Sequence, residues 1–226
     1  MTITVHTFSG SPRGWRVLLG LAFKDLSWDT NYLSLADRDH RKPEFLSLNP
    51  RHTVPVVEAD GVVLRDSIAI LAWLDREIPD KPLFGNTPGQ AAEIWQIAME
   101  CCDYLRDANR QLLSEVFFGD DAVPARGTEK HKSLRAAVKL VHAEQRYLED
   151  LLNDGRPYLA GGVPSAADAV AFPEVRLLQR ALETKHHMMT SLGFEAPEQT
   201  CPQLAAWKVR IEALPGVAAT SPAHWN

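Results

Sequence analysis

The sequence predicts an α/β domain of order β-α-β-α-β-β-α, followed by an all-helical domain. Apolar residues alternate between Thr2 and Phe8 with the period of a strand. The pair Asp60–Gly61 between two apolar runs indicates a hairpin with a two-residue turn. Prolines and glycines cluster between residues 79 and 89, and the apolar patterns that follow have helical spacing. The expected first domain, linker and second domain are therefore residues 1–80, 81–89 and 90–226.

Shorter patterns supply the other elements of the first domain. A turn-like break at Ser9–Gly14 precedes a helical stripe made by Trp15, Val17, Leu18, Leu21 and Ala22. Ser27–Leu33 is interpreted as a strand, and Pro43–Leu48 as a short helix that ends at Asn49–Pro50. Ser67 is interpreted as the N-cap of a helix that contains the apolar run Ile68–Leu74.

Four helices are expected in the second domain. They lie at Gln90–Val116, at Thr128–Leu152, from Ser165 onward, and at Gln203–Leu214. One face of the first should carry Ile94, Ile97, Cys101, Tyr104, Leu105 and Ala108. Ser165 and Asp168 form the sequence signature of a capping box, in which each residue satisfies a backbone N–H at the helix start. We therefore expect both residues to be structural.

The composition is that of an ordinary globular protein. Of the 226 residues, 45% are hydrophobic and 23% charged, and the net charge is −5. This charge argues against nucleic acid or an anionic membrane as the main partner. The N-terminus lacks the pattern of a signal peptide, and no stretch approaches the roughly 20 apolar residues of a membrane span. We expect a cytoplasmic protein.

The cysteines and histidines do not predict a disulfide framework or a metal site. Cys101, Cys102 and Cys201 are odd in number and lack the paired spacing of a zinc site, which is consistent with a reducing compartment. The run His186–Met189 contains two histidines, but adjacent residues on a helix do not face each other. We expect no metal.

The segment Asn49–Ser67 predicts a site for a small acidic peptide. Pro55 cannot donate to a sheet ladder and should begin a strand, and a cis Val54–Pro55 bond would leave the main chain of Val54 free to pair with an extended peptide. A helix start at Ser67 attracts carboxylates. Asp66 either favours the helix dipole or receives an ammonium, so an α-amino acid end would satisfy both residues.

Ser11 is the candidate catalytic residue, because it precedes a predicted helix in the segment SPRGWRV. A thiol with a pKa of about 8.5 is activated as the thiolate, and lowering this pKa by two units requires about 2.7 kcal/mol. One hydrogen bond to a charged acceptor supplies roughly 1.5–3 kcal/mol. The competing interpretation, favoured by the local pattern alone, is that Ser11 only caps the helix. The cluster His40-Arg41-Lys42 similarly forms either a solvated face or a carboxylate clamp.

Five segments in order resemble the cytosolic glutathione transferase family, serine-type, and most closely its phi class and related bacterial enzymes. They are SPRGWRV, HRKPEFLSLNPRHTVPVV, LRDSIAILAWLD, GGVPSAADAVAFP and CPQLAAWKVRIEALPGV. The resemblance implies a thioredoxin-like first domain, glutathione as co-substrate, a small hydrophobic electrophile as the second substrate, and a homodimer. Trp95 and Met99, on the helix at Gln90–Val116, are the candidate dimer residues. Tyr104 on the same helix is the candidate co-substrate contact.

The resemblance also implies a role for each glutathione-binding residue. Ser11 would activate the thiol, and Val54 would pair with the cysteinyl unit ahead of a cis Pro55. Asp66 and Ser67 would hold the γ-glutamyl end. His40 and Arg41 would lie near the glycine carboxylate. Thr53 stands where the family often has Gln or Lys, so its contact would be weaker or absent.

Departures from other classes narrow the expected chemistry. Thr7 stands where tyrosine-type classes carry their catalytic residue, and the loop holds no cysteine. The Ser-Ser-Cys run of the zeta class is missing, which argues against maleylacetoacetate isomerase activity. Ser9 remains an alternative thiol partner. A glutathione-dependent lyase, isomerase or dehalogenase, and a non-catalytic binding or scaffold protein, remain alternative functions.

Overall fold

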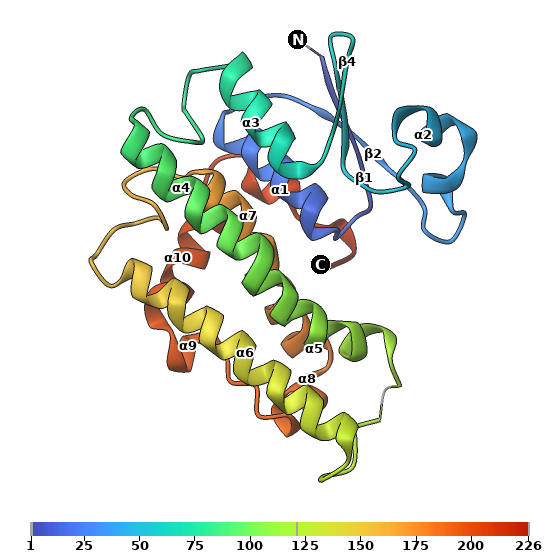
Figure 1. The fold of residues 1–226 in the computed structure, drawn as a ribbon, viewed down its shortest axis with the longest axis vertical. Helices are drawn as coiled ribbons and strands as arrows, with labels where there is room; N and C mark the ends of the chain where they lie inside the picture. The colour runs from blue at the N-terminus through green and yellow to red at the C-terminus, as the bar shows by residue number, and fades with distance from the viewer. Residues whose placement is uncertain (1, 121, 226) are drawn as a thin grey trace.

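A four-stranded mixed sheet lies in the N-terminal part of the chain, within residues 3–65 (Figure 1). The structure is a computed structural model that describes residues 2–120 and 122–225. The strand order is β2-β1-β3-β4, where β1 and β2 are parallel and the other pairs antiparallel. The strands are β1 at Ile3–Thr7, β2 at Asp29–Tyr32, β3 at Val56–Ala59 and β4 at Val62–Arg65.

Helices cover both faces of this sheet. α1 (Pro12–Phe23) and α3 (Ser67–Glu77) pack together on one side, and α2 (Pro43–Leu48) lies on the other (Figure 1). On the α2 side, the ring of His6 packs edge-on against Phe45, with centroids 6.5 Å apart. The predicted order β-α-β-α-β-β-α is confirmed, with one short 3-10 turn added before α2.

The second half of the chain is helical, as predicted. Its longer helices are α4 (Pro88–Glu100), α5 (Arg106–Phe118), α6 (Glu129–Leu152), α7 (Ala166–Thr184) and α10 (Pro202–Glu212). The sequence patterns did not predict the short helices α8 (His186–Ser191), α9 (Pro197–Thr200) and α11 (Val217–Thr220), nor a 3-10 turn at Ala223–Trp225. In the part of the chain that the structure describes, no helix combines the length and apolarity needed to cross a bilayer.

One expected helix differs from its prediction. A π-helical turn, Cys101–Leu105, joins α4 to α5, so the segment predicted as one regular α-helix contains a change of winding. Each residue of a π turn advances less far around the axis than in an α-helix. Tyr104 therefore leaves the predicted buried face and is 64% exposed, while Cys101 and Leu105 remain buried. The prediction that Tyr104 lies on the buried face was wrong.

α7 connects the two halves of the molecule. It packs against α1, α4 and α5, and residues from both halves share one hydrophobic core. Trp15 of α1 makes edge-to-face contacts with Phe172 of α7 and with Trp225. A second core lies among α5, α6, α7 and α8. α7 thus lies between the two parts of the molecule, and its position determines which side chains of the helical part face the start of α1.

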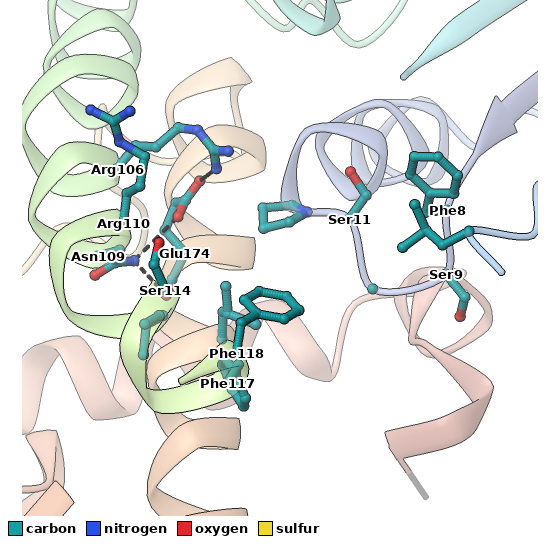
Figure 2. A pocket seen from close by; sticks show the side chains of 15 residues that line it. Phe8, Ser9, Ser11, Arg106, Asn109, Arg110, Ser114, Phe117, Phe118 and Glu174 are labelled. Carbon is teal, nitrogen blue, oxygen red and sulfur yellow. Dashed lines mark hydrogen bonds and ion pairs between the residues drawn. The ribbon is translucent and has the colours of Figure 1, made fainter. Parts of the chain in front are cut away.

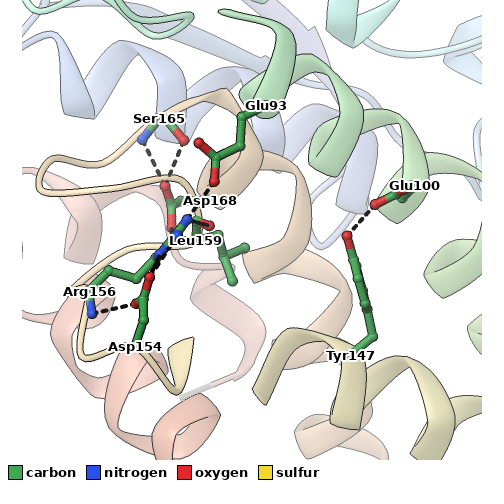
Figure 3. Close-up of polar contacts among 8 residues, drawn as sticks. All are labelled: Glu93, Glu100, Tyr147, Asp154, Arg156, Leu159, Ser165 and Asp168. Atoms are coloured by element: carbon green, nitrogen blue, oxygen red, sulfur yellow. Dashed lines mark hydrogen bonds and ion pairs between the residues drawn. The ribbon is translucent and has the colours of Figure 1, made fainter. Parts of the chain in front are cut away.

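A buried carboxylate fixes the start of α7 (Figure 3). Ser165 is the N-cap and forms the predicted capping box with Asp168. The Asp168 carboxylate is fully buried and accepts from the N–H and the hydroxyl of Ser165, both at 2.8 Å. It also accepts from the Leu159 N–H at 3.0 Å and the Trp207 indole at 2.8 Å. Burial raises the pKa of Asp168, and these four donors oppose that rise.

Candidate active site

A cavity of about 330 Å³ lies between the start of α1 and the helices α5 and α7 (Figure 2). The loop after β1 forms one side, and polar and apolar side chains of the helical half form the other. The lining residues are Phe8, Ser9, Gly10, Ser11, Pro12, Leu35, Arg106, Asn109, Arg110, Leu113, Ser114, Phe117, Phe118, Glu174 and Leu177. Tyr104, the predicted co-substrate contact, does not line this cavity.

Ser11 is the N-cap of α1 and also lines the cavity. Its hydroxyl oxygen accepts from the Gly14 N–H at 3.4 Å, which is a long bond. Gly14 lets the helix start lie close to β1, because an added Cβ would come within 1.8 Å of the Thr7 hydroxyl oxygen. The capping interpretation and the cavity position are therefore both realised at Ser11.

Ser9 has a different environment. Its hydroxyl lies 3.0 Å from Nδ1 of His224, and Figure 2 shows the Ser9 and Ser11 hydroxyls pointing in opposite directions from the loop. The engaged hydroxyl of Ser9 contrasts with that of Ser11, which accepts only a long capping bond. The geometry favours Ser11 over Ser9 as the group available to a ligand.

The predicted peptide-binding edge lies at the same end of the sheet. His6, Val56 and Arg65 are aligned across β1, β3 and β4, so the loop after β1, the residues before β3 and the start of α3 emerge side by side. The Val54–Pro55 bond is cis. Among the described residues, no backbone hydrogen bond involves Val54, so its main chain is available to an extended ligand.

The loop that precedes Val54 is held by Asn49. The Asn49 amide donates to the carbonyl oxygen of Thr53 at 2.7 Å and to its hydroxyl at 3.1 Å. The side-chain Oδ1 of Asn49 accepts from the Arg51 N–H at 3.0 Å. Thr53 thus contributes to loop structure, although its side chain remains exposed.

The start of α3 differs from its prediction, because Asp66 rather than Ser67 is the N-cap. Asp66 has φ 75°, a left-handed value that aspartate tolerates better than most residues. Its Oδ1 accepts from the N–H groups of Ile68 at 2.9 Å and Ala69 at 3.3 Å. Ser67 is the first helical residue and is buried. Asp66 is exposed and keeps its second carboxylate oxygen free of bonds to the described residues.

His40 and Arg41 lie in the 3-10 turn Asp39–Arg41. The His40 ring packs edge-on against Phe8, which lines the cavity, with centroids 5.3 Å apart. Nδ1 of His40 is buried and has no hydrogen-bond partner among the described residues. Arg41 is exposed. The basic cluster therefore adjoins the cavity through Phe8.

A buried charge cluster was not predicted from the sequence, and Figure 2 shows three of its members, Arg106, Asn109 and Glu174. Oε1 of Glu174 accepts from Arg106 Nη1 at 2.8 Å and from Arg16 Nη2 at 3.1 Å. Oε2 of Glu174 accepts from the Asn109 amide at 3.2 Å. Arg16 also donates to the Cys102 sulfur at 3.1 Å. The Glu174 side chain is 1% exposed. Its two arginine partners are 68 and 158 residues away in sequence, so no local pattern indicates the cluster.

Comparisons with known proteins give a consistent result. Residues 10–77 match the family model for the glutathione S-transferase N-terminal domain. The chain is 27% identical to glutathione S-transferase A of Pleuronectes platessa, over 96% of this chain and 90% of that protein. It is 26% identical to a probable maleylacetoacetate isomerase 1 of Drosophila melanogaster, over 78% of this chain and 69% of that protein. A glutathione S-transferase structure from the Antarctic clam Laternula elliptica superposes with a TM-score of 0.82 at 25% identity, covering 100% of this chain and 94% of that one.

Proposed function

The chain belongs to the glutathione S-transferase family, and from this premise we propose that it activates glutathione through Ser11 for attack on an electrophile. One observation carries the proposal. Ser11, the unpaired main chain of Val54 and the Asp66 cap emerge from one end of the sheet, beside a cavity walled by α5 and α7. This arrangement supports binding of an extended peptide whose thiol faces the cavity.

Ser11 supplies the chemistry in this proposal. Its oxygen accepts the long bond from Gly14, so its own proton is free to be donated to the sulfur of glutathione. The start of α1 adds a favourable field for an anion. A hydrogen bond to the thiolate contributes roughly 1.5–3 kcal/mol, enough to lower the thiol pKa by one to two units. The thiolate then forms a carbon–sulfur bond with the electrophile, whose leaving group departs with the electron pair.

The other residues hold glutathione in place. Val54 pairs through its main chain with the cysteinyl unit, and the free oxygen of Asp66 receives the γ-glutamyl ammonium. The hydroxyl and the N–H of Ser67 receive the γ-glutamyl carboxylate, since the Ile68 and Ala69 N–H groups already donate to Asp66. His40 and Arg41 face the glycine carboxylate, and Thr53 makes at most a minor contact because its hydroxyl already accepts from Asn49.

The decisive experiment compares three variants. Ser11→Ala should lower kcat/KM for 1-chloro-2,4-dinitrobenzene by about 10- to 150-fold at neutral pH, as expected for loss of a hydrogen bond to a charged group. It should also move the pH profile of the rate to higher pH, since the thiol loses its activating donor. Ser11→Thr keeps a hydroxyl and should retain most of the rate. Ser9→Ala is the matched control in the same loop. Unchanged turnover in Ser11→Ala, or a larger loss in Ser9→Ala, would show that the assigned role is wrong.

A glutathione-dependent isomerase is the second candidate, because a protein named as a probable maleylacetoacetate isomerase is among the similar proteins. Lyase and dehalogenase reactions use the same thiolate. Product analysis separates these reactions from conjugation, because only a conjugate retains the sulfur. The non-catalytic alternative is tested by calorimetry, since a scaffold protein that no longer binds glutathione gives no heat at millimolar glutathione.

We also propose that the protein forms a homodimer through the exposed face of α4. Met99 is 42% exposed and Trp95 37% exposed, and Trp95 stacks on Phe84 with centroids 4.3 Å apart. Sedimentation equilibrium tests this proposal. The variant Trp95→Glu should shift the mass toward that of one chain, whereas a wild-type protein that sediments as a monomer contradicts it.

A further inference from the structure

The cavity wall that faces Ser11 is not purely apolar, and its charges do not balance. Arg16 and Arg106 share the single carboxylate of Glu174, so three charged groups in one cluster sum to an excess of one positive charge. Arg16 and Glu174 are buried to about 98%, which keeps solvent from screening them. Buried charge of one sign favours a partner of the other sign.

Arg106 is the member of this cluster that a ligand can reach. Its side chain is 26% exposed and lines the cavity. Within the described residues, only its Nη1 is engaged, by Glu174. A guanidinium has five N–H donors in a planar fork that matches a carboxylate. Arg106 therefore has donors left for an anionic group in the cavity.

The neighbouring cations strengthen this preference. Arg13, one turn before Arg16 on α1, has its pKa lowered first by burial and then by the positive charges of Arg106 and Arg16. These cations repel one another across the gap between α1 and α5. The negative charge of Asp66 opposes this lowering of the Arg13 pKa. An anion bound at Arg106 would relieve the repulsion between Arg106 and the arginines of α1.

Apolar groups continue the same wall toward the end of α5. Leu113 is buried, Phe117 and Leu177 are half-buried, and Phe118 is 89% exposed. Seven residues separate Arg106 from Leu113, which is about 10 Å along a helix. This is the length of a substituted aromatic acid.

We propose that the electrophile of this protein carries a carboxylate, which Arg106 binds while an apolar body lies against Leu113, Leu177 and Phe117. The inference rests on the proposed function, because it treats the cavity as the co-substrate site. It replaces the expectation of a simple hydrophobic electrophile with that of an amphipathic acid. Arg106 is a specificity-determining residue in this account, and Glu174 positions its guanidinium.

Binding tests the inference without requiring turnover. The probes are 3-nitrobenzoate and its methyl ester, titrated by calorimetry in the presence of saturating S-methylglutathione, which fills the glutathione site and cannot react. Wild-type protein should bind the acid at least about tenfold more tightly than the ester, as expected for a charge-assisted contact. Equal or tighter binding of the ester overturns the proposal. Acid binding that S-methylglutathione abolishes also overturns it, because the anion site is then that of glutathione itself.

Two variants localise the effect. Arg106→Gln should reduce the acid-to-ester ratio to about one, and Arg106→Lys should restore part of it because the charge is kept. Arg110→Gln is the matched control, since it removes the same charge one turn later on α5. Arg110 also lines the cavity, but it pairs with Asp107 at 3.3 Å and points away from Glu174 in Figure 2. If Arg110→Gln lowers the ratio as much as Arg106→Gln, the preference for the acid does not come from the contact with Arg106 and the assignment is wrong. The wild-type ratio tests the proposal even if an Arg106 variant does not fold.

A turnover experiment separates this inference from the proposed function. The substrates are 4-chloro-3-nitrobenzoate and its methyl ester, in which the glutathione thiolate displaces chloride from the ring carbon. A preference for the acid in kcat/KM supports both proposals. If neither compound is consumed but 3-nitrobenzoate still binds through Arg106, the proposed function fails and the anion site stands. If the ester is turned over in preference to the acid, the proposed function stands and the proposed anion site fails.

Discussion

Two helix starts in this molecule use an aspartate in opposite ways. At α7, Asp168 is fully buried and four donors occupy its carboxylate. At α3, Asp66 is exposed, and one oxygen caps the helix while the other has no partner among the described residues. Asp66 directly precedes Ser67, and Asp168 follows Ser165 by three residues. Both aspartates satisfy N–H groups that a helix leaves unpaired.

The difference lies in what remains after the helix has been capped. A carboxylate with every acceptor position used has no capacity for a ligand, so Asp168 is structural. A carboxylate with one free oxygen at an exposed helix start can bind a cation without breaking any internal bond, and Asp66 has this form. Counting the unused acceptors of an aspartate is therefore more informative about its role than its neighbours in the sequence.

The largest expected effect is that of Asp168→Ala. The change leaves the Leu159 and Ser165 N–H groups and the Trp207 indole without an acceptor in a buried site. Because each unpaired donor is costly, we expect a loss of about 3–5 kcal/mol in the free energy of unfolding. Urea denaturation followed by tryptophan fluorescence measures it. A urea midpoint within error of that of the wild type would contradict the structural role of Asp168.

Asp66→Ala should affect ligand binding more than folding. Losing the acceptor for the γ-glutamyl ammonium should weaken glutathione binding by about tenfold, since the lost contact is a charge-assisted hydrogen bond. The measurement is calorimetric titration with glutathione. Asp66→Asn keeps a capping oxygen and serves as the control for the helix start. If both variants bind glutathione as tightly as wild type, the free oxygen has no role in binding.

Ser165→Ala tests the contribution of one of the four donors to Asp168 at the start of α7. It removes the hydroxyl that donates to Asp168 at 2.8 Å but keeps the backbone donor from the same residue. Loss of such a cap residue costs about 1 kcal/mol, which is clearly less than the change expected for Asp168→Ala. Thermal unfolding without glutathione measures the loss of stability, and unfolding with saturating glutathione measures how much the ligand stabilises the variant. Glutathione should stabilise this variant as much as it stabilises wild type, because Ser165 is not among the residues proposed to bind glutathione.

Ser67→Ala should have the smallest effect on stability. Ser67 is the first helical residue and not the cap, so the free energy of unfolding should change by less than about 0.5 kcal/mol. An N-cap serine would cost about 1 kcal/mol, and a loss of that size would contradict the assignment of Asp66 as the cap. Glutathione affinity should fall by a few-fold through loss of one hydrogen bond to the γ-glutamyl carboxylate.

The fold was predictable because its signals are local. The strand alternation, the Asp60–Gly61 turn and the capping box at Ser165 each lie within a few residues of the structure that they specify. The cap of α3 was assigned one residue too late. The reason is that Asp66 caps α3 with a positive φ of 75°, whereas an N-cap residue ordinarily has β-region angles, and the side-chain pattern does not reveal this conformation.

The cavity was the least predictable part. Arg16, Arg106 and Glu174 come from three helices, and each alone has the pattern of an ordinary charged residue. Tyr104 was misplaced because regular helical spacing was assumed through a π turn. The residues proposed to bind a ligand through backbone or loop atoms were easier to identify, since cis-proline and helix-start chemistry leave signatures in sequence.

The π turn at Cys101–Leu105 has a consequence for insertions and deletions in this chain. A π turn is equivalent to one residue inserted into an α-helix. Deleting one residue there would restore regular winding and leave the residues on either side close to their present faces, because the wide turn already accommodates the extra residue. Arg106 and Asn109 would then still reach Glu174. The same deletion within α5 has no wide turn to absorb it, so the residues after it would rotate by about 100° relative to those before it. A one-residue gap at the π turn in an alignment would therefore mark a relative with the same cavity wall, whereas the same gap inside α5 would mark a changed one.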